Sequence, residues 1–145
     1  MTSAILCIED DAETLALLAA VLSGAGFTVI TAADGQAGFE AIVAHRPDLV
    51  ICDILLPRLS GFEVLERLSW VPPESGSAVP FIFLTALDDR DAILKGRRLG
   101  ADDYVTKPVD FDILLEIVKR RLAPAGRFQQ TPAPTLSPRE LEILT

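Results

Sequence analysis

The chain has 145 residues, half of them hydrophobic, and a formal net charge of −8 at pH 7. This length allows one domain with a full core and a fragment of a second. The negative charge argues against this chain alone gripping nucleic-acid phosphates. No apolar run approaches the roughly 20 residues of a membrane span, and the N-terminus lacks the basic segment of a signal peptide, so we expect a cytoplasmic protein with no membrane contact.

Two cysteines, Cys7 and Cys52, lie inside apolar runs. A disulfide or redox pair is one interpretation, but small core residues in a reducing cytosol are the favoured one. His45 is the only histidine, which excludes a histidine-based metal or catalytic cluster within this sequence. We expect Trp70 to pack at the end of a helix rather than to serve as a ligand platform.

Short apolar runs alternate with segments of helical periodicity along the chain. Strands are predicted at residues 5–8, 27–31, 49–52, 80–84 and 104–106, and helices at 10–23, 35–46, 62–68, 88–99 and 111–122. In the second of these helices, Phe39, Ile42 and Val43 should face the core. The alternation predicts an α/β fold, with a doubly wound five-stranded parallel sheet and helices on both faces.

The most informative run is residues 49–52, which leads directly into Asp53. A continuous apolar run is typical of a strand buried on both faces; a buried helix is the alternative, but Pro47 and Pro57 leave too little room for one. A carboxylate at the end of such a strand is costly to bury unless a cation or a reaction requires it. In open α/β sheets, ligands bind at that edge.

Other polar residues follow the neighbouring predicted strands. Glu9 and Asp10 follow the first strand, Thr85 ends the fourth, and Lys107 follows the fifth. Clustered carboxylates repel one another unless a cation offsets their charge, and a set of oxygen ligands favours Mg²⁺. Lys107 and Thr85 could bind phosphoryl oxygens, and a carboxylate can itself be a nucleophile. These residues therefore predict phosphoryl transfer onto Asp53.

Each of these residues also has a simpler interpretation. The acidic residues after the first strand could cap a helix, Asp53 could be a turn residue, and Thr85 or Lys107 alone indicates little. The functional interpretation rests on their shared position at the ends of successive predicted strands.

Over roughly residues 3–122 the sequence resembles the receiver domain of bacterial two-component response regulators. The resemblance rests on four ordered motifs: Ile5-Leu-Cys-Ile-Glu-Asp-Asp11, Asp53-Ile-Leu-Leu-Pro57 with Gly61, Leu84-Thr-Ala86, and Gly100-Ala-Asp-Asp-Tyr-Val-Thr-Lys-Pro108. It implies a flavodoxin-like strand order, 2-1-3-4-5.

The resemblance also implies a role for each matching residue. Asp53 would be the phosphoacceptor, taking the phosphoryl group from a phosphohistidine on a sensor histidine kinase. Glu9 and Asp10 would hold Mg²⁺ together with Asp53 and the backbone carbonyl of Leu55, and Lys107 would pair with the phosphoryl group.

A conformational switch is implied as well. The hydroxyl of Thr85 would move onto a phosphoryl oxygen, and the ring of Tyr104 would turn inward to fill the vacated space. A cis peptide is expected before Pro108. The output face would run from Asp88 to Leu122, and we expect it to form a homodimer on phosphorylation.

That expectation of a dimer rests on charge. Basic residues of the predicted helix at 88–99 would meet Asp102 and Asp103 across a two-fold axis.

The tail has a different composition. Residues 1–123 are the predicted receiver domain, 124–135 a proline-rich linker, and 136–145 the start of a truncated C-terminal domain. Ser137, Pro138 and Glu140 form a helix-start signal. This start resembles the helix-turn-helix output domain named after the LuxR regulators, which predicts a transcription regulator that reaches DNA only through that domain.

Two other functions are open at this stage. One is a stand-alone receiver that signals by protein contact. The other is a phosphohydrolase of the haloacid dehalogenase type, but that class needs a second acid where this chain has Leu55. We expect no enzymatic activity beyond the chain's own phosphorylation and slow dephosphorylation.

Overall fold

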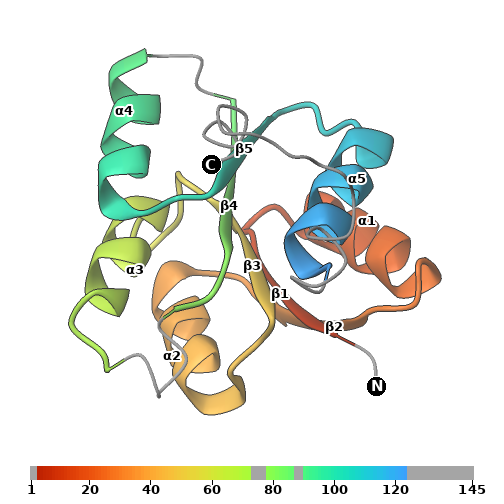
Figure 1. The fold of residues 1–145 in the computed structure, drawn as a ribbon, viewed down its shortest axis with the longest axis horizontal. Coiled ribbons are helices and arrows are strands. Elements are labelled where there is room, and N and C mark those ends of the chain that lie inside the picture. Colours follow the sequence, from red (N-terminus) through yellow and green to blue (C-terminus); the bar gives the residue numbers. More distant parts are fainter. Residues whose placement is uncertain (1–2, 73–77, 87–89, 124–145) are drawn as a thin grey trace, which may run out of the picture.

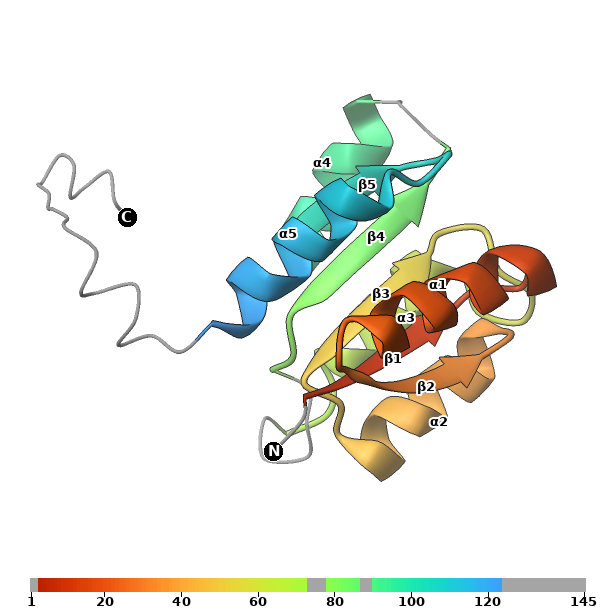
Figure 2. The ribbon, with the colours of Figure 1, turned by 90° about the vertical axis from the view of Figure 1, so that its right-hand side faces the viewer.

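The computed structural model describes residues 3–72, 78–86 and 90–123. A five-stranded parallel sheet in the order β2-β1-β3-β4-β5 forms its centre, and all strands point the same way (Figure 1 and Figure 2). The strands are β1 Ala4–Ile8, β2 Thr28–Ala32, β3 Leu49–Asp53, β4 Phe81–Thr85 and β5 Asp103–Thr106. The predicted doubly wound sheet and its strand order are confirmed.

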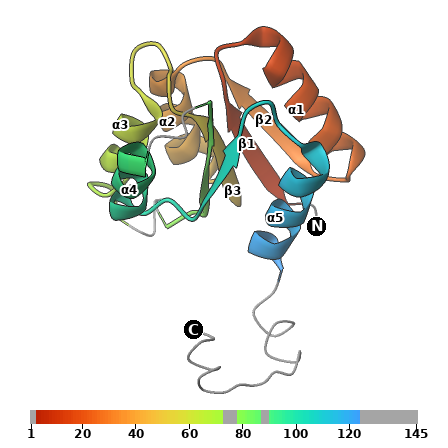
Figure 3. The same ribbon diagram turned by 90° about the horizontal axis from the view of Figure 1, so that it is seen from above.

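Helices cover both faces of the sheet, as expected for right-handed crossovers between parallel strands (Figure 3). On one face lie α1 Ala12–Gly24 and α5 Phe111–Leu122. On the other face lie α2 Gly35–His45, α3 Gly61–Leu68 and α4 Arg90–Leu99. The core is therefore divided by the sheet into two layers.

The central strands β3 and β4 are buried along their whole length. Their side chains alternate between the two core layers: Val50 and Cys52 pack towards α2 and α3, whereas Leu49 and Ile51 pack towards α1 and α5. This burial on both faces explains the continuous apolar run in the sequence. It also places Asp53 as the last residue of its strand.

The two cysteines lie in different core layers. Cys7 packs with the α1 and α5 layer and Cys52 with the α2 and α3 layer, and both thiols are free and buried. Burial raises the pKa of Cys7 to about 12, so this thiol is un-ionised at neutral pH. The interpretation of both as core residues is confirmed.

In the described part of the chain, four helices begin at a polar N-cap. The capping side chain accepts a hydrogen bond from a backbone N–H of the first turn, which satisfies one of the helix's unpaired donors. The capping residues are Asp11, Asp34, Ser60 and Asp110.

The predicted inward face of α2 is partly wrong. Ile42 is buried and Phe39 packs against the core, as predicted, but Val43 is 40% exposed, and Gly35 and Gly38 complete the buried face. At Gly35 a Cβ atom would lie 2.7 Å from the carbonyl carbon of Leu59. The backbone of α2 therefore approaches its neighbours more closely than a helix with side chains on that face could, and Val43 turns outward.

The predicted packing of Trp70 is also wrong, since this side chain is 71% exposed. The helix α3 ends at Leu68, its last buried residue, and Trp70 lies in the turn beyond it. The predicted linker and the helix start at 136–145 lie outside the described residues. Within the described part of the chain, no helix is long and apolar enough to cross a membrane.

We expect Gly35→Ala to lower the free energy of unfolding by about 1 to 3 kcal/mol, because the added methyl group overlaps the backbone of Leu59. Urea denaturation measures the change. Gly24→Ala is the matched control, because no heavy atom lies within 4 Å of a Cβ atom placed there. Equal midpoints for the two variants would contradict the proposed close approach of α2.

Candidate functional site

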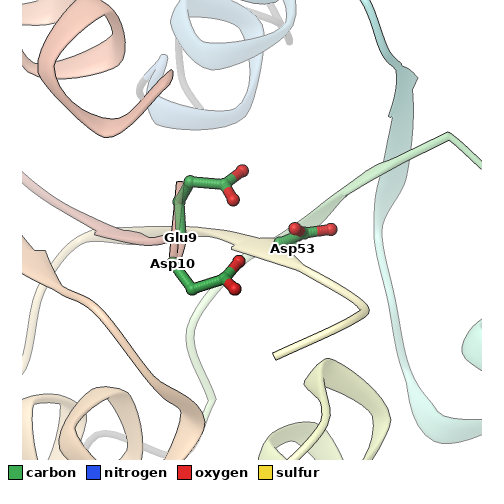
Figure 4. A group of neighbouring side chains, drawn as sticks. All are labelled: Glu9, Asp10 and Asp53. Carbon is green, nitrogen blue, oxygen red and sulfur yellow. The ribbon is translucent and has the colours of Figure 1, made fainter. Parts of the chain in front are cut away.

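Three carboxylates meet at the edge of the sheet where the parallel strands end. Glu9 and Asp10 follow β1, and Asp53 ends β3. These strands are hydrogen-bonded neighbours, with Ile8 opposite Cys52. One oxygen from each carboxylate lies within 4.8 Å of the others, and Figure 4 shows them facing a common space. The structure thus brings together the acidic residues that the sequence predicted.

Lys107, in the loop after β5, places its ammonium group among these carboxylates. Its Nζ lies 2.8 Å from Oε1 of Glu9 and 3.0 Å from Oδ2 of Asp53. The backbone N–H of Lys107 donates to the carbonyl oxygen of Thr85 at 2.8 Å, which fixes the start of the loop against β4. The predicted lysine therefore joins the acidic cluster.

The pKa of Lys107 reflects opposing effects. Partial desolvation lowers it, but the close contacts of the ammonium group with the carboxylates of Glu9 and Asp53 outweigh this and raise the pKa above 10.5. Because the pKa is raised in the folded protein, the ammonium group stabilises the fold fully at pH values below its ordinary pKa of 10.5. This contribution is lost as the pH rises through the higher pKa of the folded state.

The carboxylate of Glu9 is almost completely buried, at 1% exposure. Its Oε2 accepts a hydrogen bond from the N–H of Asp11 at 3.1 Å. Its Oε1 has the close ionic contact with Lys107 but no hydrogen bond of good geometry among the described residues. An under-bonded buried oxygen beside two further carboxylates fits Mg²⁺, which prefers oxygen ligands and keeps several waters.

Asp53 is 7% exposed and is held through both of its oxygens. Oδ1 accepts from the N–H of Ile54 at 2.8 Å, and Oδ2 accepts from Lys107 at 3.0 Å. Gly61 keeps the following loop close, because its N–H donates to the carbonyl oxygen of Ile54 and an added Cβ would collide with the backbone of Asp53. The carboxylate is therefore fixed in one orientation.

Thr85 ends β4 beside Asp53 and is 3% exposed, so its side chain belongs to the same edge. Tyr104 lies on β5, opposite Phe83, and its hydroxyl donates to the carbonyl oxygen of Ile93 on α4 at 2.7 Å. The two residues expected to form the switch thus come from adjacent strands, with the tyrosine hydroxyl bound to α4.

Two further predicted positions follow the same strand ends. Leu55 lies in the loop after β3 with a side chain that is 67% exposed, and the ligand role of its carbonyl stays a prediction. The peptide bond between Lys107 and Pro108 is cis, as expected.

Gly96 was missed by the sequence analysis. It is the one buried residue of α4, and a Cβ atom there would overlap the phenol of Tyr104. A glycine inside a helix lowers the stability of that helix by about 1 kcal/mol relative to alanine. A glycine in the predicted helix therefore indicated that a neighbouring group occupies the space of a side chain.

The family of response regulator receiver domains matches residues 5–119. This chain belongs to that family. The transcriptional regulatory protein DltR of Streptococcus agalactiae serotype III (strain NEM316) is 40% identical over 117 residues, which are 81% of this chain and 50% of DltR. The DNA-binding response regulator MtrA of Mycobacterium tuberculosis (strain ATCC 25618 / H37Rv) is 36% identical over 143 residues, which are 99% of this chain and 59% of MtrA.

Solved structures give the same result for this receiver domain. A CheY-like response regulator receiver domain protein from Methanospirillum hungatei JF-1 has a TM-score of 0.77 at 30% identity, covering 84% of this chain and 94% of that one. The chemotaxis protein CheY4 of Vibrio cholerae has a TM-score of 0.78 at 25% identity, covering 84% and 100%. The chain spans only about half to three fifths of the length of the curated relatives named above.

Family membership gives the receiver its general properties. Receiver domains are signalling domains, and they generally bind Mg²⁺. The acidic cluster of Glu9, Asp10 and Asp53 is the group of described residues that could hold the ion.

We expect Mg²⁺ at ten times its dissociation constant to stabilise the wild-type receiver by about 1.4 kcal/mol, because the ion binds the folded acidic cluster. Asp10→Asn should lose most of this gain. Thermal unfolding with Mg²⁺ and with excess chelator measures it. Glu13→Gln removes an exposed acid of α1 outside the cluster and should keep the full gain; an equal loss in both variants would contradict the assigned site.

Proposed function

We propose that Asp53 is the phosphoacceptor of a response regulator and takes its phosphoryl group from a phosphohistidine on a sensor histidine kinase. The observation that supports this is the position of the Lys107 ammonium, 3.0 Å from Asp53 and 2.8 Å from Glu9. A cation beside a nearly buried carboxylate offsets the cost of burying its charge, and a carboxylate can itself act as a nucleophile.

In the transfer, a carboxylate oxygen of Asp53 bonds to phosphorus as the bond from phosphorus to the histidine nitrogen breaks. The electron pair of that bond returns to the imidazole, and the product is an acyl phosphate. Lys107 then pairs with the added negative charge, while the N–H of Ile54 holds the carboxyl group in place. Glu9, Asp10, Asp53 and the Leu55 carbonyl would hold Mg²⁺, which would offset the negative charge of the phosphoryl oxygens.

The same proposal assigns the switch to Thr85 and Tyr104. The Thr85 hydroxyl bonds a phosphoryl oxygen, and the ring of Tyr104 moves inward beside it. Their positions in the sheet support this assignment. Thr85 ends β4, one strand from Asp53, and Tyr104 lies on β5, two strands from Asp53. A charge added at Asp53 in this way biases the neighbouring helix α4.

The output in this proposal is DNA binding through a domain that begins near residue 136, after a linker at 124–135. The alignment with MtrA covers 143 residues, so it extends past the receiver into this tail. The name of MtrA supports a DNA-binding output, and the capped start at Ser137, Pro138 and Glu140 supports an output of the LuxR type. The alternative is a receiver that signals by protein contact alone, which the structural likeness to CheY4 favours.

We expect Asp53→Asn to abolish phosphorylation by acetyl phosphate and Mg²⁺, because the amide is not nucleophilic yet keeps the shape of the side chain. Intact-mass spectrometry measures the gain of one phosphoryl group in the wild type. Asp112→Asn, an exposed acid on α5, is the control and should label normally. Full labelling of Asp53→Asn would refute the assignment.

We also propose that phosphorylation promotes a homodimer through the described part of the segment from Asp88 to Leu122. Two exposed apolar side chains, Leu94 on α4 and Ile113 on α5, support this surface. The acidic partners suggested by the sequence are engaged within the chain: Asp102 accepts from the N–H of Phe81 at 2.7 Å, and Asp103 pairs with Arg121 at 2.7 Å. The apolar pair therefore replaces them as the main support.

We expect beryllofluoride with Mg²⁺ to double the mass of the wild type in light scattering, and Ile113→Glu to remain monomeric, because a buried unpaired charge opposes association. Leu17→Glu is the matched control, since Leu17 is a comparably exposed leucine on α1 and should still dimerise. A wild-type mass that stays monomeric over a wide concentration range would count against the dimer.

A further inference from the structure

Helix α4 is attached to the sheet through an unusually small contact. Its one buried residue is Gly96, which offers no side chain of its own. Around this glycine, the ammonium of Lys95 lies 4.9 Å from the centre of the Phe62 ring, and the guanidinium of Arg97 lies 5.4 Å from that of Tyr104. Leu99 at the end of α4 packs against the core, and these two cation–π contacts add to that attachment around Gly96.

The phenol of Tyr104 occupies the space that a side chain at Gly96 would need. A Cβ atom there would lie 2.9 Å from the Cζ atom of Tyr104 and would overlap its hydroxyl outright. That hydroxyl donates to the carbonyl oxygen of Ile93 at 2.7 Å, and the ring packs beside Phe83 with 5.7 Å between centroids. We call this space, bounded by Ile93, Gly96 and Phe83, the tyrosine seat.

The environment of the phenol agrees with this geometry. Burial raises the pKa of Tyr104 above 10.0, although the nearby guanidinium of Arg97 acts in the opposite direction. The hydroxyl is thus protonated at neutral pH and can act as the donor to Ile93.

We infer that Gly96 is a positioning residue of the switch, because the absence of a side chain there creates the seat that holds Tyr104 on α4 in the unphosphorylated receiver. The inference rests on the proposed function, in which Tyr104 leaves this position when Asp53 carries a phosphoryl group. Seating and phosphorylation then oppose each other, and by linkage a change that destabilises the seated state strengthens binding of a phosphoryl mimic.

The test is Gly96→Ala in the full chain, probed with beryllofluoride and Mg²⁺. The added methyl group overlaps Tyr104, so the half-saturating mimic concentration should fall about tenfold. A second measurement is made on the protein without the phosphoryl mimic. Tyr104 is the only tyrosine, so the NMR signal of ¹³C-labelled tyrosine Cζ reports this one phenol, and it should move to the shift of a solvated phenol.

Two further variants separate seating from general destabilisation. Gly24→Ala also replaces a helical glycine, but into open space, and should change neither reading. Tyr104→Phe keeps the ring and loses only the hydrogen bond to Ile93, so the mimic should bind about fivefold more tightly. This second variant decides the question if Gly96→Ala does not fold.

Two outcomes overturn the inference. A displaced tyrosine signal with unchanged mimic binding means that the seat exists but does not control the switch. An unmoved signal in folded Gly96→Ala means that the seat does not depend on Gly96. If instead the wild type binds no mimic at Asp53, the proposed function fails, and the coupling to Gly96 fails with it, while the tyrosine signal still reports separately on the seat.

Discussion

The acidic cluster depends on one interaction, the contact of the Lys107 ammonium group with the carboxylates of Glu9 and Asp53. A carboxylate with 1% exposure and another with 7% would each be costly to bury without a cation. The three residues come from β1, β3 and the loop after β5, and they meet only because parallel strands end at the same edge. The order of the sheet is thus a requirement of this charge arrangement.

Strand β4 makes contacts outside the sheet at both of its ends and at its middle. At one end Thr85 accepts a hydrogen bond from Lys107, and at the other the N–H of Phe81 donates to the carboxylate of Asp102. Between them Phe83 contacts Tyr104 and lies edge-on to Phe62. A rearrangement near Asp53 can therefore reach α4 through one strand and its aromatic neighbours, with no other element having to unfold.

Much of this arrangement could be predicted from the sequence, for identifiable reasons. The apolar run before Asp53 and the polar residues after its neighbouring strands placed the acidic cluster correctly. The strand order could not be predicted from those runs, because the apolar residues of a strand do not specify which strands lie beside it. It was predicted from the resemblance to receivers. Val43 was assigned inward because helical periodicity weighs apolar side chains and ignores glycine, yet Gly35 and Gly38 form part of the contact face of α2.

The tyrosine seat could not be predicted for a related reason. Its acceptor is the backbone carbonyl of Ile93, which every residue possesses, and its space is the absence of a side chain at Gly96. Neither leaves a distinctive residue type in the sequence. Only the glycine's cost to its helix indicated that something occupies that space.

The shallow attachment of α4 has a consequence for how such proteins diverge. Because Gly96 is the one fully buried residue of α4, exposed residues of this helix such as Arg90 and Arg98 can change with little effect on folding stability. A duplicated copy of this gene could therefore acquire a new partner surface on α4 while its phosphorylation chemistry stayed intact. Two signalling pathways descended from one ancestor could then stop cross-reacting, and every intermediate variant along the way would still fold.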